Sequence, residues 1–324
     1  MNVLITGGLG FIGSNLFNFM REKYPDYQLV ILDSCTYAAD EKNINDIKSA
    51  KIVKFSITDR QRLFELFENH KITHVIHLAA ESHVDNSILN PMEFVNTNIV
   101  GTINLLDASV KYKIEKFYHI STDEVFGQLG PTGEFTENTP YDPRSPYSAS
   151  KASSDHFVRA YHHTYKLPVI ISNCSNNFGP NQHEEKLIPT IIKNIIKQTP
   201  IPIYGNGTNV RDWLYVMDHV DAIDTIFHRG KIGETYCIGG GYQMSNLRLT
   251  HIICDKLNDI LDYGTNSRDL ITFVDDRKGH DFRYAIDYSK LRKTLNWEPK
   301  TTFEDGIDET INYYLNKFIK HLEL

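Results

Sequence analysis

The sequence has few cysteines, and none of them suggests a metal site or a disulfide framework. Cys35, Cys174, Cys237 and Cys254 lie far apart and lack the spacing of metal ligands. Scattered thiols of this kind are typical of proteins in a reducing compartment. We therefore expect a cytoplasmic protein without a bound metal ion.

Positive charge and long apolar runs are also scarce. The 324 residues carry a net charge of −7, which argues against a general nucleic-acid binder because phosphate contacts need clustered Lys and Arg. A local basic pocket for one small phosphorylated ligand is still compatible with this charge. The chain has no apolar run of membrane-spanning length, and its opening residues "MNVLITGG" look like a strand rather than a signal peptide. We expect no membrane partner.

Short apolar runs alternate with helical patterns along the first half of the chain. Helices are expected at 12–23, 59–70, 94–112 and 148–166, and strands at 2–6, 28–33, 51–55, 74–79, 116–121 and 168–172. Strands that alternate with helices predict βαβ units and a parallel sheet. The expected fold class is therefore α/β, a Rossmann-type doubly wound parallel sheet.

The pattern changes after about residue 175, where a polar loop with Gly and Pro precedes an Ile-rich helix at 187–198. We expect a smaller C-terminal substrate-binding domain there. A helix at 213–228 and a strand at 234–239 could return to the main sheet. The expected division is 1–175 plus roughly 213–239 for cofactor binding, and 176–212 and 240–324 for the substrate.

A glycine-rich turn indicates a dinucleotide site. "TGGLGFIG" places Gly7, Gly10 and Gly13 between a strand and an amphipathic helix, where small residues let a pyrophosphate approach the helix N-terminus. Asp33 ends the second strand, twenty residues after Gly13. A carboxylate there favours the ribose hydroxyls of NAD and disfavours the extra phosphate of NADP. An ordinary tight turn and a capping aspartate are the alternatives.

A tyrosine–lysine pair and an acid pair are the candidate catalytic groups. Tyr147 and Lys151 in "SPYSASK" are spaced to share one helix face, where the ammonium could favour the phenolate. Asp123 and Glu124 stand side by side in "HISTDEVFG". A simple dehydrogenase needs one base, so the acid pair requires a separate explanation; a helix N-terminus is the alternative.

Several motifs together resemble those of the extended short-chain dehydrogenase/reductase family. The motifs are "TGGLGFIG", "LAAESHVD", "STDEVFG" and "YSASK", followed by "NNFGPNQHEEKLIP", "PIYGNGTNVRDWLYV" and "DDRKGHDFRYAID". Within that family the chain is similar to the nucleoside-diphosphate-glucose 4,6-dehydratases, over nearly its whole length. Such enzymes oxidise C4 of the sugar, eliminate water across C5 and C6, and return the hydride to C6.

The resemblance implies roles for the candidate groups. Tyr147, beside Lys151, would take the 4-hydroxyl proton, with Thr122 hydrogen-bonded to that hydroxyl. Glu124 would remove the C5 proton, and protonated Asp123 would donate to the departing 6-hydroxyl. Successive side chains of a strand point to opposite faces, so we predict a helical turn that starts at or just after Thr122.

The resemblance also implies binding residues and an assembly. NAD would contact Gly7, Gly10, Phe11, Ile12, Gly13, Asp33, Ile57, Leu78, Ala79, Ala80, Thr97, Tyr147, Lys151 and Asn177. The nucleotide sugar would contact Ser82, Thr122, Asn176, Lys186, Leu187, Tyr204, Arg211, Asn246, Arg277 and His280. A homodimer is expected through helices 94–112 and 148–166, which carry Ile103, Leu106, Phe157 and Tyr161.

Two other classes are compatible with this scaffold. A nucleotide-sugar 4-epimerase or a decarboxylase would not need the Asp123–Glu124 pair in these roles. A non-enzymatic NAD-binding protein is possible because a fold alone does not establish activity. The choice between a thymine and a uracil nucleotide is left open by the sequence.

Overall fold

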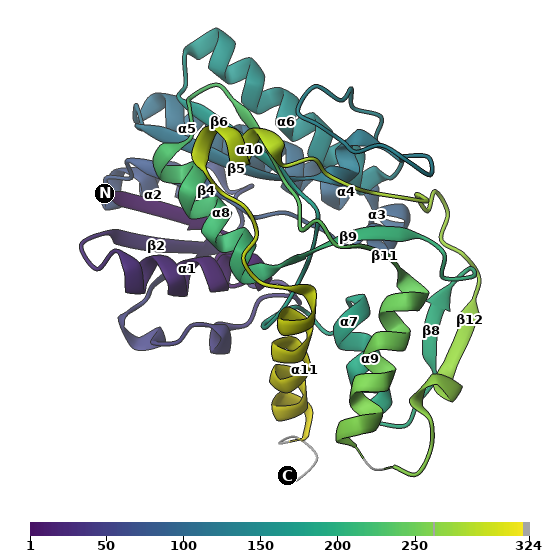
Figure 1. Ribbon diagram of the computed structural model, residues 1–324. Helices are drawn as coiled ribbons and strands as arrows, with labels where there is room; N and C mark the ends of the chain where they lie inside the picture. The colour runs from purple at the N-terminus through teal and green to yellow at the C-terminus, as the bar shows by residue number, and fades with distance from the viewer. Residues whose placement is uncertain (262, 320–324) are drawn as a thin grey trace.

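The computed structural model describes residues 1–261 and 263–319, and its largest feature is a parallel sheet (Figure 1). The strand order is β10-β6-β5-β4-β1-β2-β3. The strands are β1 (Asn2–Thr6), β2 (Gln28–Asp33), β3 (Lys51–Lys54), β4 (His74–His77), β5 (Lys116–Thr122), β6 (Val169–Cys174) and β10 (Thr235–Ile238). The chain runs from β1 to β3 on one side and from β4 to β10 on the other. The predicted doubly wound sheet is confirmed.

Helices cover both faces of this sheet. One face packs against α1 (Phe11–Lys23) and α8 (Val216–Arg229), and the other against α2 (Arg60–His70), α5 (Thr102–Lys111) and α6 (Pro146–Tyr165). On β1, Val3 and Ile5 face the first helix layer while Leu4 faces the second. Both faces are thus buried, which explains why the strands read as continuous apolar runs.

Two of the predicted elements differ from the structure. The helix expected at 94–112 is divided into α4 (Pro91–Phe94), a π-helical segment η3 (Val95–Gly101) and α5. The helix expected at 213–228 begins at Val216, because residues 213–215 end strand β9 (Val210–Tyr215). The strand expected at 234–239 is confirmed as β10, which pairs with β6.

A smaller region lies beside the carboxyl ends of the main strands (Figure 1). It holds a three-stranded sheet in the order β11-β9-β7 and a two-stranded sheet β12-β8. These strands are β7 (Asn176–Phe178), β8 (Ile201–Tyr204), β11 (Gln243–Ser245) and β12 (Ile271–Val274). An apolar cluster of α7 (Leu187–Ile196), α9 (Asn246–Ile260) and α11 (Phe303–Ile319) forms its core.

The remaining helical segments are short. They are α3 (Val84–Leu89), α10 (Ser289–Leu295), η1 (Glu41–Asn43), η2 (Ile47–Ser49), η4 (Asp123–Phe126) and η5 (Ser267–Leu270). The α10 helix packs on β10 and α8. The division of the chain into two domains stays a prediction.

The helices expected to form a dimer seam present only part of the predicted surface. Leu106 is fully buried in the chain's own core, so it is unable to face a partner. Phe157 on α6 is 39% exposed. Within the described residues, no helix is long and apolar enough to cross a membrane.

Candidate active site

The glycine-rich turn after β1 has no room for larger side chains. Gly7 has a φ of +70°, and a Cβ added there would lie 2.7 Å from the backbone nitrogen of Ala79. A Cβ on Gly13 would lie 2.1 Å from the carbonyl oxygen of Gly7. Gly10 caps α1 without a side-chain hydrogen bond. The first N–H groups of α1 therefore face the turn uncovered, as an anion-binding helix end requires.

Asp33 is held at the end of β2 by two backbone groups. Its Oδ2 accepts from the N–H of Leu9 at 3.0 Å, and its Oδ1 accepts from the N–H of Cys35 at 2.8 Å. These contacts fix the carboxylate beside the glycine turn. Each oxygen keeps a further lone pair with which it could accept from a ribose hydroxyl.

One cavity runs from Asp33 along the carboxyl edge of the sheet to Asp123 and Glu124. Every residue predicted to bind the cofactor lines it, as do Thr122 and both acids. Ser34, Thr36 and Ala38 also line it and are missed by the sequence analysis. They follow Asp33 directly, so their position in the chain is the signal that could have identified them.

The strand β5 ends in the predicted helical turn. Thr122 is extended, with φ −132° and ψ 156°, and the 3₁₀ segment η4 begins at Asp123. The Thr122 Oγ1 accepts from the N–H of Glu124 at 3.3 Å, which caps the turn. The prediction of a strand-to-helix break here is confirmed. The break brings Thr122, Asp123 and Glu124 to one cavity.

Asp123 and Glu124 have different electrostatic surroundings. Asp123 is 1% exposed, and burial, the Glu124 carboxylate and Asp212 raise its pKa well above the usual value. Burial also raises the pKa of Glu124, but Arg211, Arg277 and Lys186 oppose that rise. The surroundings therefore favour the protonated form of Asp123 more strongly than that of Glu124, which leaves Glu124 the more acidic of the two.

Contacts of the two carboxyls are few. Thr122 Oγ1 donates to Asp123 Oδ1 at 3.2 Å, and Ser148 Oγ lies 3.5 Å from Glu124 Oε2. Asp123 Oδ2 has no hydrogen-bond partner among the residues that the structure describes. A buried carboxyl oxygen of this kind is available to a ligand.

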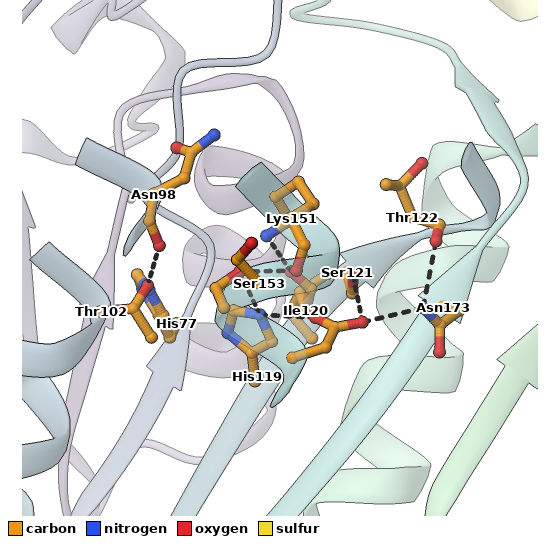
Figure 2. A network of polar contacts seen from close by, with 12 residues as sticks. His77, Asn98, Thr102, His119, Ile120, Ser121, Thr122, Lys151, Ser153 and Asn173 are labelled. Carbon is orange, nitrogen blue, oxygen red and sulfur yellow. Dashed lines mark hydrogen bonds and ion pairs between the residues drawn. The ribbon is translucent and has the colours of Figure 1, made fainter. Parts of the chain in front are cut away.

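Tyr147 and Lys151 lie in the first two turns of α6. Ser145 caps this helix by accepting from the N–H of Ser148 at 3.0 Å. Lys151 Nζ donates to the carbonyl of Ile120 at 2.9 Å, as Figure 2 shows. Burial and the Glu124 carboxylate raise the pKa of Tyr147 well above its usual value. Those surroundings oppose the phenolate that the sequence predicts, so a further positive charge is needed to form it.

A second cavity continues from the first into the smaller region. Ser82, Glu124, Asn176, Glu185 and Lys186 line both cavities. All residues predicted to bind the substrate line the second cavity, except Thr122, which lines the first. Glu124 lines both cavities and therefore stands where they meet.

The predicted phosphate-binding residues are held by neighbours. Arg277 forms a two-pronged ion pair with Asp85, with Nε–Oδ1 2.6 Å and Nη2–Oδ2 2.9 Å. The Arg211 guanidinium stacks 4.3 Å from the ring centre of Tyr284. Lys186 Nζ lies 3.4 Å from the carbonyl of Ser82. These contacts collect cationic groups around the second cavity.

Further lining residues are missed by the sequence analysis. Asp85 and Glu185 both lie inside motifs that support the family resemblance, so proximity to those motifs was a usable signal. Asn177 Oδ1 lies 2.8 Å from Nδ1 of His219, a buried histidine that orients this amide. Tyr284 likewise lies inside the motif "DDRKGHDFRYAID", whereas His219 lies outside all of these motifs and gives no local signal.

The fold and this site define a Rossmann-type protein for redox chemistry on a nucleotide-linked ligand. The GDP-mannose 4,6-dehydratase family model matches residues 4–310. The dTDP-glucose 4,6-dehydratase of Salmonella typhimurium is 47% identical, covering 97% of this chain and 93% of the relative. The relative of the same name from Neisseria gonorrhoeae is 46% identical, with coverages of 97% and 96%. The chain belongs to the dTDP-glucose 4,6-dehydratase family.

Solved structures agree with this assignment. A Bacillus anthracis dTDP-glucose 4,6-dehydratase in complex with NAD has a TM-score of 0.89 at 41% identity, covering 98% of this chain and 97% of its own. A Streptomyces venezuelae dTDP-glucose 4,6-dehydratase with NAD and TYD bound has a TM-score of 0.91 at 40% identity, with the same coverages. A UDP-glucose 4-epimerase of Thermotoga maritima also reaches 0.89, at 28% identity, covering 98% of this chain and 99% of its own. The backbone alone therefore does not separate dehydration from epimerisation.

Proposed function

We propose that the protein dehydrates a nucleoside-diphosphate glucose, dTDP-glucose in the first place, to the 4-keto-6-deoxy sugar with NAD as resident cofactor. The observation that carries this proposal is the Asp123–Glu124 turn at the junction of the two cavities. The names of the relatives point to the same reaction.

The cofactor cavity fits NAD. The spaces at Gly7 and Gly13 admit backbone and phosphate but no side chain, and Asp33 sits where a ribose would lie. The other lining residues proposed to hold NAD are Gly10, Phe11, Ile12, Ile57, Leu78, Ala79, Ala80, Thr97, Tyr147, Lys151 and Asn177. When bound, NAD supplies the acceptor for a hydride from C4 and the donor of that hydride to C6.

The first step is oxidation at C4. Tyr147 removes the 4-hydroxyl proton while Thr122 hydrogen-bonds to that oxygen. Burial keeps Tyr147 neutral in the protein alone, so the cationic ring of the oxidised cofactor is the charge that would favour its phenolate. Lys151, anchored on Ile120, adds a second positive charge on the same helix.

The second step is elimination of water. Glu124 removes the C5 proton, which the new C4 ketone makes acidic. Asp123 donates its proton to the departing 6-hydroxyl, so the oxygen leaves as water and a C5–C6 double bond forms. Glu124 would return its proton to C5 while C6 receives the hydride that bound NAD would supply, so the net change is the loss of one water molecule.

The second cavity is proposed to hold the nucleotide. Arg211, Arg277 and Lys186 supply positive charge for the diphosphate. Tyr204, whose ring lies under the Arg277 guanidinium at 5.1 Å, is proposed to contact the base. Polar or apolar contacts would come from Ser82, Asn176, Leu187, Asn246 and His280.

We also propose a homodimer in a reducing compartment such as the cytoplasm. Exposed apolar side chains gather on helical segments that pack together, namely Leu89, Met92, Val100, Phe157 and Tyr165. The four cysteines are free, which suits such a compartment. Light scattering that gave the mass of a single 37.3 kDa chain would contradict the dimer.

A direct experiment tests the function. The purified protein is assayed for bound NAD and then supplied with dTDP-glucose and UDP-glucose separately. Mass spectrometry should show a sugar product lighter by one water, without net reduced cofactor. A folded, NAD-loaded protein that returns both sugars with their full mass, as an epimerase would, contradicts the proposal.

A further inference from the structure

A buried carboxylate beside the site takes part in none of the steps above. Asp155 lies on α6 one turn after Lys151 and is fully buried. Its oxygens face groups from three other segments, which are His119 Nε2 at 3.1 Å, Ser121 Oγ at 2.9 Å, Tyr141 OH at 2.7 Å and Asn173 Nδ2 at 3.4 Å. Figure 2 shows His119, Ser121 and Asn173 close together at this position.

Asp155 is ionised in spite of its burial. Burial alone would raise its pKa, but the hydrogen bond from His119 and the charge of Lys151 hold that pKa below the usual value. Burial and Lys151 lower the pKa of His119 to about 4. The histidine is therefore neutral at neutral pH, and Asp155 carries a negative charge.

Lys151 needs a counter-charge because it is 5% exposed. Burial lowers the pKa of its ammonium, and Asp155 is the strongest influence in the opposite direction. The carbonyl of Ile120 gives Lys151 one acceptor but no charge. A buried ammonium without an anion is costly.

The contacts of Asp155 also join two elements. Ser121 and His119 belong to β5, and Asn173 of β6 donates to the carbonyl of Thr122 at 3.0 Å. The strand that ends in Thr122 is thereby tied to the helix that carries Tyr147.

We propose that Asp155 is a positioning residue, whose carboxylate is the counter-charge of Lys151 and whose hydrogen bonds hold the end of β5 against α6. This inference rests on the proposed function for its consequence in catalysis. Its structural part, the pairing of the two charges, does not depend on any activity.

Other titratable groups surround the pair. They are His77 of β4, His119 of β5, Asp123 and Glu124 of η4, Cys174 of β6, Tyr147 and Arg159 of α6, and Tyr141. Burial keeps His77, His119 and Cys174 neutral near pH 7, and burial also favours the protonated form of Asp123. Asp155 is thus an ionised carboxylate one helical turn from Lys151, and the two charges interact through the buried interior without a direct ion pair.

The catalytic consequence is tested by the pH profile of C4 oxidation, followed in single turnovers. Asp155→Asn keeps the shape and removes the charge. Lys151 should then lose its proton at lower pH, which moves the alkaline limb of this step down by about one pH unit. Tyr141→Phe removes a hydrogen bond to Asp155 but keeps the Asp155 charge, so the alkaline limb of its pH profile should not move. The proposal would be overturned if Asp155→Asn lowered the rate of C4 oxidation at every pH without moving the alkaline limb. An equal shift of that limb in Tyr141→Phe would also overturn it.

Urea unfolding tests the charge pairing without any activity. Asp155→Asn should lower the unfolding midpoint, because it leaves the Lys151 ammonium buried and unpaired. In a Lys151→Met background the same change should cost much less. If Asp155→Asn alone does not fold, the double variant with Lys151→Met should recover folding. The pairing is contradicted if Asp155→Asn lowers the urea midpoint equally in the parent and in the Lys151→Met background. It is also contradicted if the double variant folds no better than Asp155→Asn alone.

Discussion

At the scale of single residues, the chemistry depends on how differently the protein treats two adjacent acids. Asp123 is buried near the Glu124 and Asp212 carboxyls, whereas Glu124 is near the cations of the second cavity. Burial raises the pKa of both carboxyls, and the neighbouring charges make the two pKa values differ. An acid and a base for elimination can thus be taken from one turn of chain.

Removal of the acidic proton should affect elimination selectively. Asp123→Asn is expected to slow water loss by roughly 100-fold or more, with a much smaller effect on C4 oxidation. Quenched reactions analysed by mass spectrometry should then show the 4-keto sugar that has not lost water. Asp142→Asn, the same change at an exposed acid, is the control and should leave both steps unaltered. Equal slowing of the two steps would argue against Asp123 as the acid.

The burial of Asp212 should make the free energy of unfolding depend on pH. Burial raises its pKa to about 6, above the unfolded value. A carboxyl with a raised native pKa contributes most to stability below its unfolded pKa and loses that contribution as pH rises through 6. Asp212→Asn should therefore be more stable than the parent above pH 6, by about 1 to 3 kcal/mol, and the gap should shrink towards pH 4. Urea midpoints measured across this range check the trend; a gap that widens in acid contradicts it.

Most candidate residues could be predicted because they lie in contiguous motifs. The glycine turn, the acid pair and the Tyr147–Lys151 spacing are local patterns with a direct physical meaning. Asp155 and His219 could not be predicted in this way. Their roles depend on partners such as His119 and Asn177, which only the packed structure brings to them.

At the scale of elements, the site is made by chain breaks at the ends of strands. β1 ends in the glycine turn, β2 in Asp33 and β5 in the capped segment η4. Because the strands are parallel, these ends share one edge of the sheet. The edge therefore collects the groups proposed to bind the cofactor and to catalyse the reaction.

The glycine turn gives a sharp test of close packing. Gly13→Ala would place a methyl group against the Gly7 carbonyl at 2.1 Å, which should destabilise the fold by about 1 to 3 kcal/mol and strongly lower the bound NAD. Gly130→Ala is the matched control, since a Cβ there meets nothing within 4 Å. Cofactor content and thermal melting measure both effects. Full NAD content in Gly13→Ala would contradict the role of the turn.

The elements of the main sheet could be predicted well, and those of the smaller region could not. Buried parallel strands have a strong apolar signal, whereas β7, β11 and β12 have three or four residues each within loop-like sequence. The π-helical turns of η3 have no distinct signal in "VNTNIVG". The β9–α8 junction was misplaced because "WLYV" suits a strand and a buried helix equally.

At the scale of the whole molecule, the two cavities share lining residues and together reach from the proposed adenine side to the proposed nucleotide-sugar side. They meet at Glu124, between the main sheet and the smaller region. Helices α4, η3, α5 and α6 lie on the far side of the sheet from α1 and α8 (Figure 1). The proposed dimer would use this outer surface and leave both cavities open.

The dimer should depend on apolar residues of that surface. Phe157→Glu is expected to shift the mass in solution from twice 37.3 kDa towards a single chain, because a carboxylate resists burial at an interface. Ile260→Glu, the same kind of change at an exposed residue of α9, should leave the mass unaltered. Light scattering over a concentration series measures both. A Phe157→Glu protein that keeps the dimer mass would place the interface elsewhere.

The central claim is that this chain removes water from a nucleotide-linked glucose through its acid pair. Mass spectrometry of dTDP-glucose incubated with the purified, NAD-loaded protein tests it most directly. The product should be lighter by one water, with no net reduced cofactor, and this product should be lost in Asp123→Asn. A sugar nucleotide of unchanged mass with the parent protein would contradict the account.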